Sequence, residues 1–407
     1  MMHFSKIKTL VLYAGYTRVL SYFEDWSDAF IEAEEFEITV VNIANKNNLG
    51  LVERTVKNYD FIVILHSAFG DTLDYISHYK NILRERPAKL MVFVGNEVNY
   101  PPPLLGVHEK IVFLQSIKPD FIATQLPLET GQKLYEDITG AGVVDLPHAL
   151  NPKRFSPAVS QSARKIDIGV RTHKYYPFIG DNERTSLVEY FVKTGVASPL
   201  RLDVSTDYRA RFSSGKWSEF LNKCKGTLAT EAGSYYLEKD DATVIKIAGY
   251  IKNRCGPLQK YSFKFEERYK KFIPVFFKSI LRTIMGISGT EERYGKGIYY
   301  SVGFEEIYER FFKNYLNSLN GKCISSRHFE AIGTKTCQIM FPGRFNGILE
   351  ADKHYLSLNL DFSNIKEVLE KFRDLSYRTK LVDDAYEYVM SHHTYRHRIK
   401  KISGLFK

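Results

Sequence analysis

A charged segment followed by an apolar one offers the clearest chemistry in this sequence. Arg327 and Glu330 lie in a polar stretch that we expect to begin a helix, and the apolar run Thr336–Phe341 follows, ended by Pro342-Gly343. Charged side chains beside a helix start and a strand end are where α/β proteins hold nucleotide phosphates and riboses. The segment therefore predicts a nucleotide site in the second half of the chain.

A second basic group precedes this segment. Arg171 and His173 follow an expected strand, and Arg184 lies near the start of the next expected helix. A phosphate could bind there for the same reason. Ordinary solvated surface charge is the alternative interpretation.

Two α/β units must position these residues. Through the first 150 residues, short apolar runs alternate with amphipathic stretches, which is typical of βαβ units around a parallel sheet. The expected strands are Lys8–Ala14, Glu37–Ile43, Phe61–Leu65, Lys89–Val94, Ile111–Leu114 and Val143–Leu146, and the expected helices are Thr17–Glu34 and Asp71–Arg86.

A polar linker, Ser156–Ser162, separates this unit from the second. The expected strands of the second unit are Lys165–Val170, Leu200–Val204, Gly226–Thr230, Thr336–Phe341 and His354–Asn359, and its helices are Glu183–Thr194, Trp217–Lys223 and Asn364–Leu375. A long helical section, about 242–319, interrupts it. Its basic and apolar centre, Lys270–Arg282, would either touch anionic lipid or, as we favour, pack on the domain with a solvated basic edge.

Composition narrows the function classes. The 407 residues exceed one ordinary core, so two domains are expected. The net charge of +10 indicates an anionic partner, but no aromatic RNA-reading motif, zinc-finger spacing or arginine-rich tail points to nucleic acid. The four cysteines form no C-x-x-C pair, which fits a reduced, cytoplasmic compartment. No apolar stretch approaches the length of a membrane span.

Several motifs resemble those of group 1 glycosyltransferases of the GT-B fold. The Arg-x-Phe-Glu-Ala element at 327–331 resembles their nucleotide-holding region, and the glycine turn and Asp-x-His-Tyr within Phe341–Tyr355 extend the match. Lys225–Ser234 resembles their strand followed by Glu-x-Gly-Ser, and Leu146–Pro152 resembles their interdomain crossing. The His-Thr-Tyr-x-x-Arg at 393–398 resembles the ending of the spore-coat-like subgroup.

The resemblance implies a role for each matching residue. Glu330 would bind the ribose hydroxyls of a nucleotide-sugar, and Arg327 would stabilise the departing diphosphate without a metal. The remaining donor-site residues would be Glu231, Ser234, Gly343, Asp352 and His354, of which the last two could meet the sugar hydroxyls. The alternatives are a Glu330 that interacts only with a helix dipole and a His354 that is purely structural.

One departure from the family pattern affects the expected mechanism. Lys322 stands eight residues before Glu330, where the Glu-x7-Glu signature has its first glutamate, so retaining chemistry is not implied. If the reaction inverts, a base from the first domain must reach the acceptor hydroxyl. His66, Asp71 and Glu97 follow expected strands there, and we select His66; a loop histidine without a catalytic role is the alternative.

The histidines of the last helix have a simpler interpretation. His393 and His397 have metal-compatible spacing, but the sequence offers no third ligand, so we predict no metal site. We expect this helix to pack back against the first domain, as the C-terminal helix of GT-B proteins does.

We therefore predict an α/β protein with two Rossmann-like domains facing across a cleft (GT-B) and a helical insertion in the second domain. The predicted parts are an acceptor-side domain at 1–155, a donor domain at 165–385 with its insertion at about 242–319, and the C-terminal helix at 386–407.

The predicted function is transfer of a sugar to a hydroxyl of a glycan or lipid-linked acceptor, in surface glycan biosynthesis. The donor nucleotide-sugar is a substrate, and no cofactor is expected. We expect a cytoplasmic protein and no nucleic-acid partner. A peripheral position at the inner face of an anionic membrane is the alternative that the basic segment leaves open. The alternatives are a catalytically silent glycosyltransferase-like module, favoured by Lys322, and, on charge alone, a nucleic-acid-associated protein.

Overall fold

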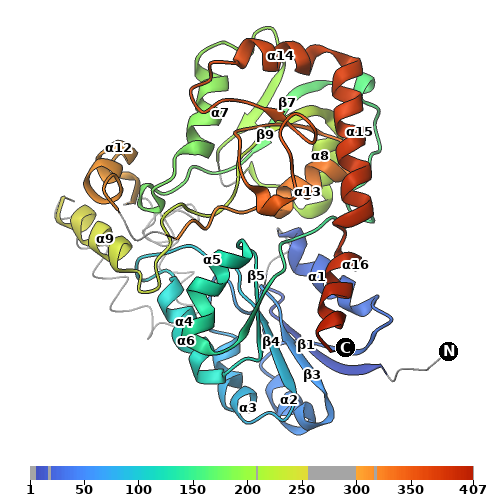
Figure 1. Cartoon of the computed structure of the whole chain (residues 1–407), viewed down its shortest axis with the longest axis vertical. Coiled ribbons are helices and arrows are strands. Elements are labelled where there is room, and N and C mark those ends of the chain that lie inside the picture. Colours follow the sequence, from blue (N-terminus) through green and yellow to red (C-terminus); the bar gives the residue numbers. More distant parts are fainter. Residues whose placement is uncertain (1–5, 17–19, 208–209, 255–298, 316–318, 407) are drawn as a thin grey trace, which may run out of the picture.

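The computed structural model describes residues 6–16, 20–207, 210–254, 299–315 and 319–406. Two parallel sheets organise these residues, one in each of two lobes (Figure 1). The predicted basic segment Lys270–Arg282 lies outside the described residues.

The first sheet has six strands in the order β2-β1-β3-β4-β5-β6, and each neighbouring pair is parallel. Its strands are β1 (Ile7–Tyr13), β2 (Phe36–Asn42), β3 (Phe61–Ile64), β4 (Lys89–Phe93), β5 (Phe121–Thr124) and β6 (Gly142–Asp145). Every residue of β3 is buried, because helices cover both faces of the sheet. Because all neighbouring strands are parallel, the carboxyl ends of the six strands meet at one edge of the sheet.

The helices of this domain connect successive strands. They are α1 (Ser21–Ile31), α2 (Asn48–Thr55), α3 (Lys80–Arg84), α4 (Val107–Ile117), α5 (Leu128–Gly131) and α6 (Asp137–Thr139), with short 3-10 turns at Val56–Asn58 and Ile76–Tyr79 and a π-helical turn at Gln132–Glu136. The predicted helix Asp71–Arg86 is thus shorter than expected, since only its second half is helical.

One predicted strand is wrong. Ile111–Leu114 lies within helix α4, whose buried residues Val107, Ile111, Leu114 and Ile117 recur every three or four positions. A four-residue apolar run fits a buried helix as well as a strand, and the true strand here, β5, begins ten residues later.

The second sheet has five strands in the order β11-β10-β9-β7-β8, again with parallel neighbours. Its strands are β7 (Ile166–Arg171), β8 (Leu202–Ser205), β9 (Cys224–Ala229), β10 (Cys337–Met340) and β11 (Leu356–Ser357). Its helices are α7 (Glu183–Lys193), α8 (Ser214–Lys223), α9 (Ala242–Arg254), α12 (Phe304–Ile307), α13 (Ser326–Gly333), α14 (Ile365–Arg373), α15 (Leu375–His392) and α16 (Tyr395–Ser403). The short turns are 3-10 at Gln161–Ala163, Pro177–Ile179, Phe345–Gly347 and Gly404–Phe406 and π-helical at Tyr308–Phe312.

Helices α9 and α12 form a small projection beside the two lobes (Figure 1). Its start is tied to the first domain, because the Asp241 carboxylate accepts hydrogen bonds from the amides of Val107 (3.2 Å) and His108 (2.8 Å) at the beginning of α4. The start of the insertion is therefore held against the first domain.

The end of the chain returns to the first domain. Helix α15 runs along the second lobe and α16 continues onto the first (Figure 1). The Leu150 amide donates to His393 O at 2.9 Å, and the Tyr395 ring packs edge-on against Trp26 with centroids 5.1 Å apart. This crossing completes the two-domain α/β arrangement with parallel sheets, and the predicted GT-B fold class is confirmed.

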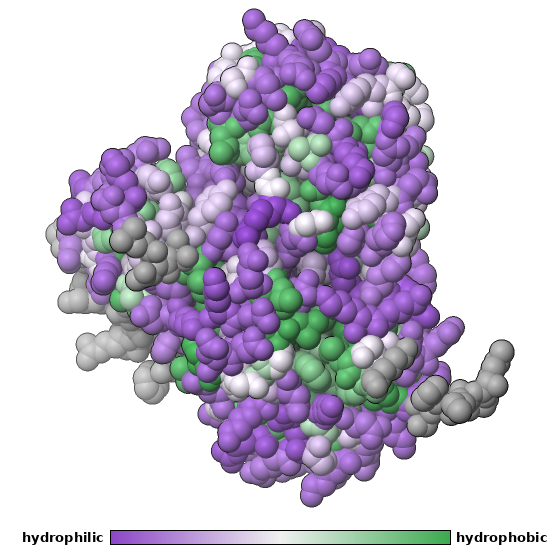
Figure 2. All heavy atoms as spheres, in the orientation of Figure 1, coloured by the Kyte–Doolittle hydropathy of each residue, from purple (hydrophilic) through white to green (hydrophobic). Residues whose placement is uncertain are grey.

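The surface is mostly hydrophilic on the face shown in Figure 2, with apolar residues gathered towards the middle of the molecule. Within the described part of the chain, no helix is both long and apolar enough to cross a membrane.

Candidate nucleotide site

A cavity lies where strands β7 and β9 end and helix α13 begins. Its lining comes from the ends of both strands, the first turns of α7 and α13, and Trp217 of α8: Val170, Arg171, Thr172, Arg184, Leu187, Val188, Trp217, Thr227, Leu228, Ala229, Thr230, Ser325, Arg327, His328 and Ala331. The carboxyl edge of a parallel sheet and the start of a helix meet here, which is the usual ligand position in open α/β sheets.

A second cavity continues the first towards the other domain. The two share Arg171, Trp217 and Arg327, and the second adds Leu20, Ser21 and Tyr22 from the first domain, together with Arg211, Phe212, Ser214, Ser326 and Glu330. Because both domains contribute walls, the combined space lies in the cleft between them.

Glu330 lies at the contact between the domains. It is 6% exposed, and its two carboxylate oxygens accept hydrogen bonds from Ser21 Oγ at 2.6 Å and Trp217 Nε1 at 2.7 Å. Ser21 belongs to α1 of the first domain and Trp217 to α8 of the second. The carboxylate therefore already binds a hydroxyl and an N–H group, which is the chemistry a ribose hydroxyl would use.

Two arginines of the cavity contact aromatic rings. No carboxylate in the described ranges lies within ion-pair distance of Arg184 or Arg327. Arg184 stacks instead on the ring of Tyr175 at 4.2 Å, and Arg327 lies 5.1 Å from the Trp217 ring and donates to Arg171 O at 2.6 Å. Burial lowers the pKa of Arg327 to about 10. The negative charge of Glu330 acts to raise this pKa, and the positive charge of Arg184 acts to lower it. The cavity thus favours an anion.

Arg171 differs from these two. Its Nη2 forms an ion pair with Asp203 Oδ1 at 2.7 Å, and its guanidinium stacks on Phe220 at 4.4 Å. Arg171 therefore shapes the wall of the cavity, with its charge already paired.

The start of α13 is held by a reciprocal cap. The Ser325 side chain accepts from the His328 backbone amide, and His328 Nδ1 accepts from the Ser325 amide at 3.0 Å. Burial lowers the pKa of His328 to about 4, so the ring stays neutral and can accept this hydrogen bond. The first turn of α13 consequently keeps its position at the cavity wall.

Lys322 has its own carboxylate partners. The side chain is 1% exposed, and its Nζ lies 2.5 Å from Asp181 Oδ2 and 2.9 Å from Glu183 Oε2. Burial lowers the pKa of Lys322, but the two carboxylates raise it more, so it lies above its usual value. The residue that departs from the family signature thus ties the segment before α13 to the start of α7.

Three of the predicted donor residues have partners outside the two cavities. The Glu231 carboxylate accepts a hydrogen bond from the Phe345 amide at 2.6 Å, and a Cβ on Gly343 would lie 2.6 Å from its other oxygen, so a larger residue at 343 would displace this carboxylate. Ser234 Oγ donates to Ile179 O at 2.7 Å. These residues support the loops around the site without lining it.

Asp352 and His354 also lie outside the cavities. The Asp352 carboxylate is exposed and lies 3.8 Å from Lys371 Nζ. The His354 ring stacks on Tyr388 of α15 with centroids 4.6 Å apart, and its Nδ1 accepts the Glu350 amide. The loop that holds them faces α15 rather than the donor cavity.

His66 lies inside the first domain. It is 2% exposed, and its ring packs against Phe93 (5.2 Å) and His148 (5.0 Å). Burial lowers the pKa of His66 to about 3. The histidine selected from the sequence as catalytic base therefore lines neither cavity.

The structure also adds residues that the motifs did not indicate. Ser21, Tyr22, Arg211 and Trp217 line the second cavity. Trp217 is one of only two tryptophans in the chain, which is a weak signal, but the sequence gives no indication that Ser21 lies opposite Glu330.

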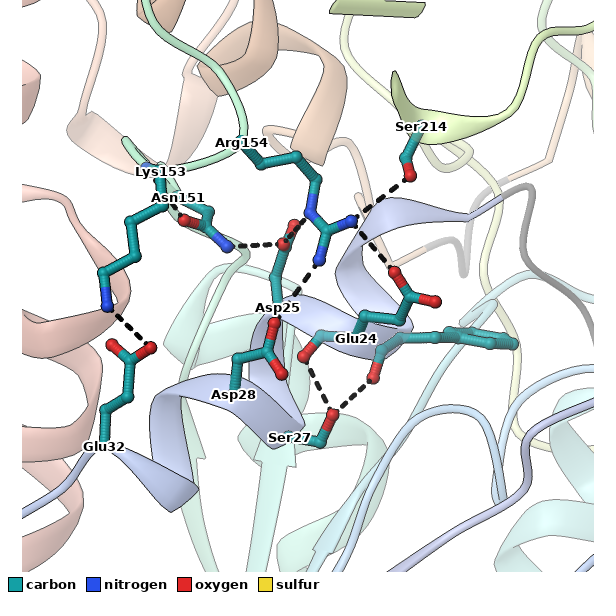
Figure 3. Close-up of polar contacts among 10 residues, drawn as sticks. Glu24, Asp25, Ser27, Asp28, Glu32, Asn151, Lys153, Arg154 and Ser214 are labelled. Atoms are coloured by element: carbon teal, nitrogen blue, oxygen red, sulfur yellow. Dashed lines mark hydrogen bonds and ion pairs between the residues drawn. The ribbon is translucent and has the colours of Figure 1, made fainter. Parts of the chain in front are cut away.

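A cluster of ion pairs lies next to the cleft and joins Arg154, just before the linker, to α1 (Figure 3). The Arg154 guanidinium contacts Glu24 (2.9 Å), Asp25 (2.8 Å) and Asp28 (3.3 Å), and its Nη1 also donates to Ser214 Oγ of α8. Burial raises the pKa of Asp25 to about 7, although a hydrogen bond from Asn151 and the positive charge of Arg154 both act to lower it. We call these four charged residues the linker cluster.

No group of three or more histidine, cysteine, aspartate or glutamate side chains is arranged to hold a metal ion within the ranges that the structure describes.

Comparison with known proteins agrees with this class of site. Residues 299–404 match a family of proteins described as glycosyl transferase-like, and the matched region contains α13 with Arg327 and Glu330. Over residues 299–404, this match agrees with the predicted resemblance to glycosyltransferases.

Solved structures match as well. One is the crystal structure of Anabaena HepE in complex with UDP-glucose. HepE is 8% identical to this chain in sequence, and the TM-score is 0.46. The match covers 98% of this chain and 99% of HepE. A search of curated proteins found no match. The sequence identity and the TM-score are too low to assign any property of HepE to this chain.

Proposed function

We propose that this protein transfers a sugar from a nucleotide-sugar to a hydroxyl acceptor in the cleft between its domains. The observation that carries the proposal is the pair of arginines, Arg184 and Arg327, that line the cavity at the start of α13 and form no ion pair with a carboxylate of the described residues. A diphosphate would neutralise both charges and accept hydrogen bonds from the first turn of the helix.

Glu330 supports a nucleoside next to that diphosphate. Its hydrogen bonds to Ser21 and Trp217 show that it can accept two donors at 2.6–2.7 Å. We infer that ribose hydroxyls replace Ser21 Oγ when the domains separate to admit the donor. As the sugar departs, Arg327 stabilises the charge that develops on the diphosphate, a role that requires no metal.

The finer parts of the proposal concern the acceptor and the cellular site. We propose a hexose-type donor and a glycan or lipid-linked acceptor in surface polysaccharide biosynthesis. We also propose a cytoplasmic protein, and the net charge of +10 is compatible with peripheral association at an anionic membrane. The spore-coat-like subgroup and the roles of the individual residues belong to this proposal too.

A thermal-shift and calorimetric screen against UDP, GDP, ADP, CMP and dTDP tests the donor site. We expect stabilisation by one nucleoside diphosphate and about tenfold weaker binding in Glu330→Gln, since one charge-assisted hydrogen bond is lost. The matched control Glu219→Gln, at an exposed position of α8, should bind like the wild-type protein. No response of the wild-type protein to any of the five would contradict the proposal.

A second candidate function has the same fold but no catalytic activity. In a catalytically silent module, Glu330 would serve only as the interdomain contact to Ser21, and Lys322 would be a buried structural cation. Nucleotide binding without release of free sugar from any tested nucleotide-sugar would favour this second function.

A further inference from the structure

The hydrogen bond between Ser21 and Glu330 occupies the carboxylate that the proposed donor requires. Ser21 is the first residue of α1 and is 5% exposed, and Glu330 is 6% exposed. One Glu330 oxygen accepts from Ser21 Oγ at 2.6 Å, and the other accepts from Trp217 Nε1 at 2.7 Å. A serine hydroxyl and a ribose hydroxyl donate the same kind of hydrogen bond to a carboxylate. Ser21 therefore takes the position of a ribose hydroxyl.

The cavities beside this contact are too small for a nucleotide. In each of them, about 40 Å³ is open to the centre of a water-sized sphere. One water needs roughly 10–15 Å³ on this measure, whereas pockets for small-molecule ligands have volumes of about 300–1,000 Å³. The two domains as described therefore leave no room for the donor, and a wall of the cleft must move before a nucleotide can enter.

The wall that contains Ser21 belongs to the first domain and is fixed to it. Helix α1 lies where the two lobes meet (Figure 1), and residues 20–22 form the first-domain side of the second cavity. The Tyr22 ring packs against His148 with centroids 4.2 Å apart, and Trp26 Nε1 donates to His148 Nδ1 at 3.2 Å. These contacts attach the start of α1 to its own domain, so separation of the domains carries Ser21 away from the donor side of the cleft.

A second group of contacts joins the domains at the loop after β10. Arg344 forms an ion pair with Glu129 at 2.7 Å, and Asn346 Nδ2 donates to Gln125 O at 3.0 Å. The two side chains of the ion pair are 45% and 66% exposed, and ion pairs this exposed contribute little to stability. A hydrogen bond to a buried carboxylate is stronger. The contact at Glu330 therefore resists separation of the domains more than this ion pair does.

We propose that the hydrogen bond from Ser21 to Glu330 is an autoinhibitory contact, which keeps the cleft closed until a nucleoside diphosphate displaces the serine hydroxyl. The inference rests on the proposed nucleotide-sugar site and adds a means of regulating it. A ligand that binds only one of two states has an apparent affinity reduced in proportion to the population of that state. Because the contact stabilises the closed state alone, removing the Ser21 hydroxyl should strengthen nucleotide binding.

The test compares nucleotide binding by wild-type protein, Ser21→Ala and the control Ser27→Ala. Calorimetric titrations use UDP, GDP, ADP, CMP and dTDP. Ser27 lies in the same helix, and its hydroxyl donates to Glu24 O at 2.8 Å, so the control removes a hydroxyl that does not bind Glu330. We expect Ser21→Ala to bind the recognised nucleotide about 5- to 10-fold more tightly than wild type, and Ser27→Ala to bind it within about twofold of wild type. Ser21→Gly removes the same hydroxyl and should show the same gain.

A Glu330→Ala background shows whether the gain in affinity acts through the carboxylate. This variant has lost the partner of Ser21, so adding Ser21→Ala should change nucleotide affinity by less than about twofold. A gain of the full size in this background would mean that the serine acts elsewhere, and would overturn the proposal.

The remaining outcomes separate this inference from the proposed function. Nucleotide binding by Ser21→Ala that is equal to or weaker than binding by wild type overturns the autoinhibitory contact and leaves the nucleotide site intact. A gain of the same size in Ser27→Ala overturns the contact as well. If neither wild type nor Ser21→Ala binds any of the nucleotides, the proposed function and this inference fail together.

Discussion

Arginines of two neighbouring regions have opposite electrostatic surroundings. In the linker cluster, Arg154 lies among three carboxylates within 3.3 Å (Figure 3). In the donor cavity, Arg184 and Arg327 contact aromatic rings and backbone, and among the described residues no carboxylate is within ion-pair distance of either. A guanidinium that forms ion pairs within its own chain stabilises the fold, and one that forms none is available to a ligand.

This comparison predicts separate consequences of mutation in the two regions. Changes in the linker cluster should alter the free energy of unfolding with little effect on nucleotide affinity. Changes at the cavity arginines should alter nucleotide affinity with little cost in stability, because neither arginine forms an ion pair with a carboxylate of the described residues.

The largest effect is expected from Arg154→Met. The change removes the guanidinium beside Asp25, whose side chain is 4% exposed, and we expect the free energy of unfolding at pH 8 to fall by about 2–3 kcal/mol. Urea denaturation measures this. A loss below about 0.5 kcal/mol, or a loss of nucleotide affinity that equals the loss of stability, would remove the distinction between the regions.

A smaller effect, on binding alone, is expected from Arg184→Met. Loss of one charge-assisted contact to a phosphate should weaken nucleoside diphosphate binding about tenfold, with the unfolding midpoint unchanged. The control is Arg396→Met, at an exposed arginine of α16 whose nearest acidic partner is Glu35 at 3.5 Å. Equal affinities of the two variants would contradict a phosphate contact at Arg184.

The smallest effect is a pH dependence of the linker cluster. Asp25 has a folded-state pKa of about 7, above the ordinary value of an aspartate, so the folded protein holds this proton more tightly than the unfolded chain. The stability that Asp25 contributes is therefore present near pH 4 and is lost as the pH rises to about 7. Denaturation of wild type and Asp25→Asn at pH 5, 6 and 7 should show a difference that changes by at most about 1.4 kcal/mol per pH unit. A wild-type protein that gains stability relative to the variant over this range would show that the sign is wrong.

Much of the fold could be predicted from the sequence because parallel strands buried on both faces are short continuous apolar runs. Phe61–Leu65 and Lys89–Val94 differ from the observed strands β3 and β4 by one residue each. The same feature explains the error at Ile111–Leu114, since burial on a helix and burial in a strand select the same residue types. Only the caps and the partner surface distinguish them, and the cap of α4 comes from Asp241, which is distant in sequence.

The candidate site was predictable only in part. Arg171, Arg184, Arg327 and Glu330 come together because they belong to a strand end and two helix starts at one sheet edge. Glu231 was also expected there, yet its carboxylate is bound by the Phe345 amide. A motif identifies a carboxylate but does not show whether the chain's own amides already bind it. The first-domain contribution of Ser21 to Glu330 depends on how the domains meet, which no local pattern encodes.

Calorimetric titration of the wild-type protein and Arg327→Met with a nucleoside diphosphate and with the corresponding nucleoside tests the central claim most directly. If Arg327 holds the diphosphate, the variant should bind the diphosphate at least tenfold more weakly, by about 1.4 kcal/mol or more, while nucleoside affinity stays the same. Equal weakening for both ligands, or no weakening for the diphosphate, would contradict the assignment of Arg184 and Arg327 to a nucleotide donor.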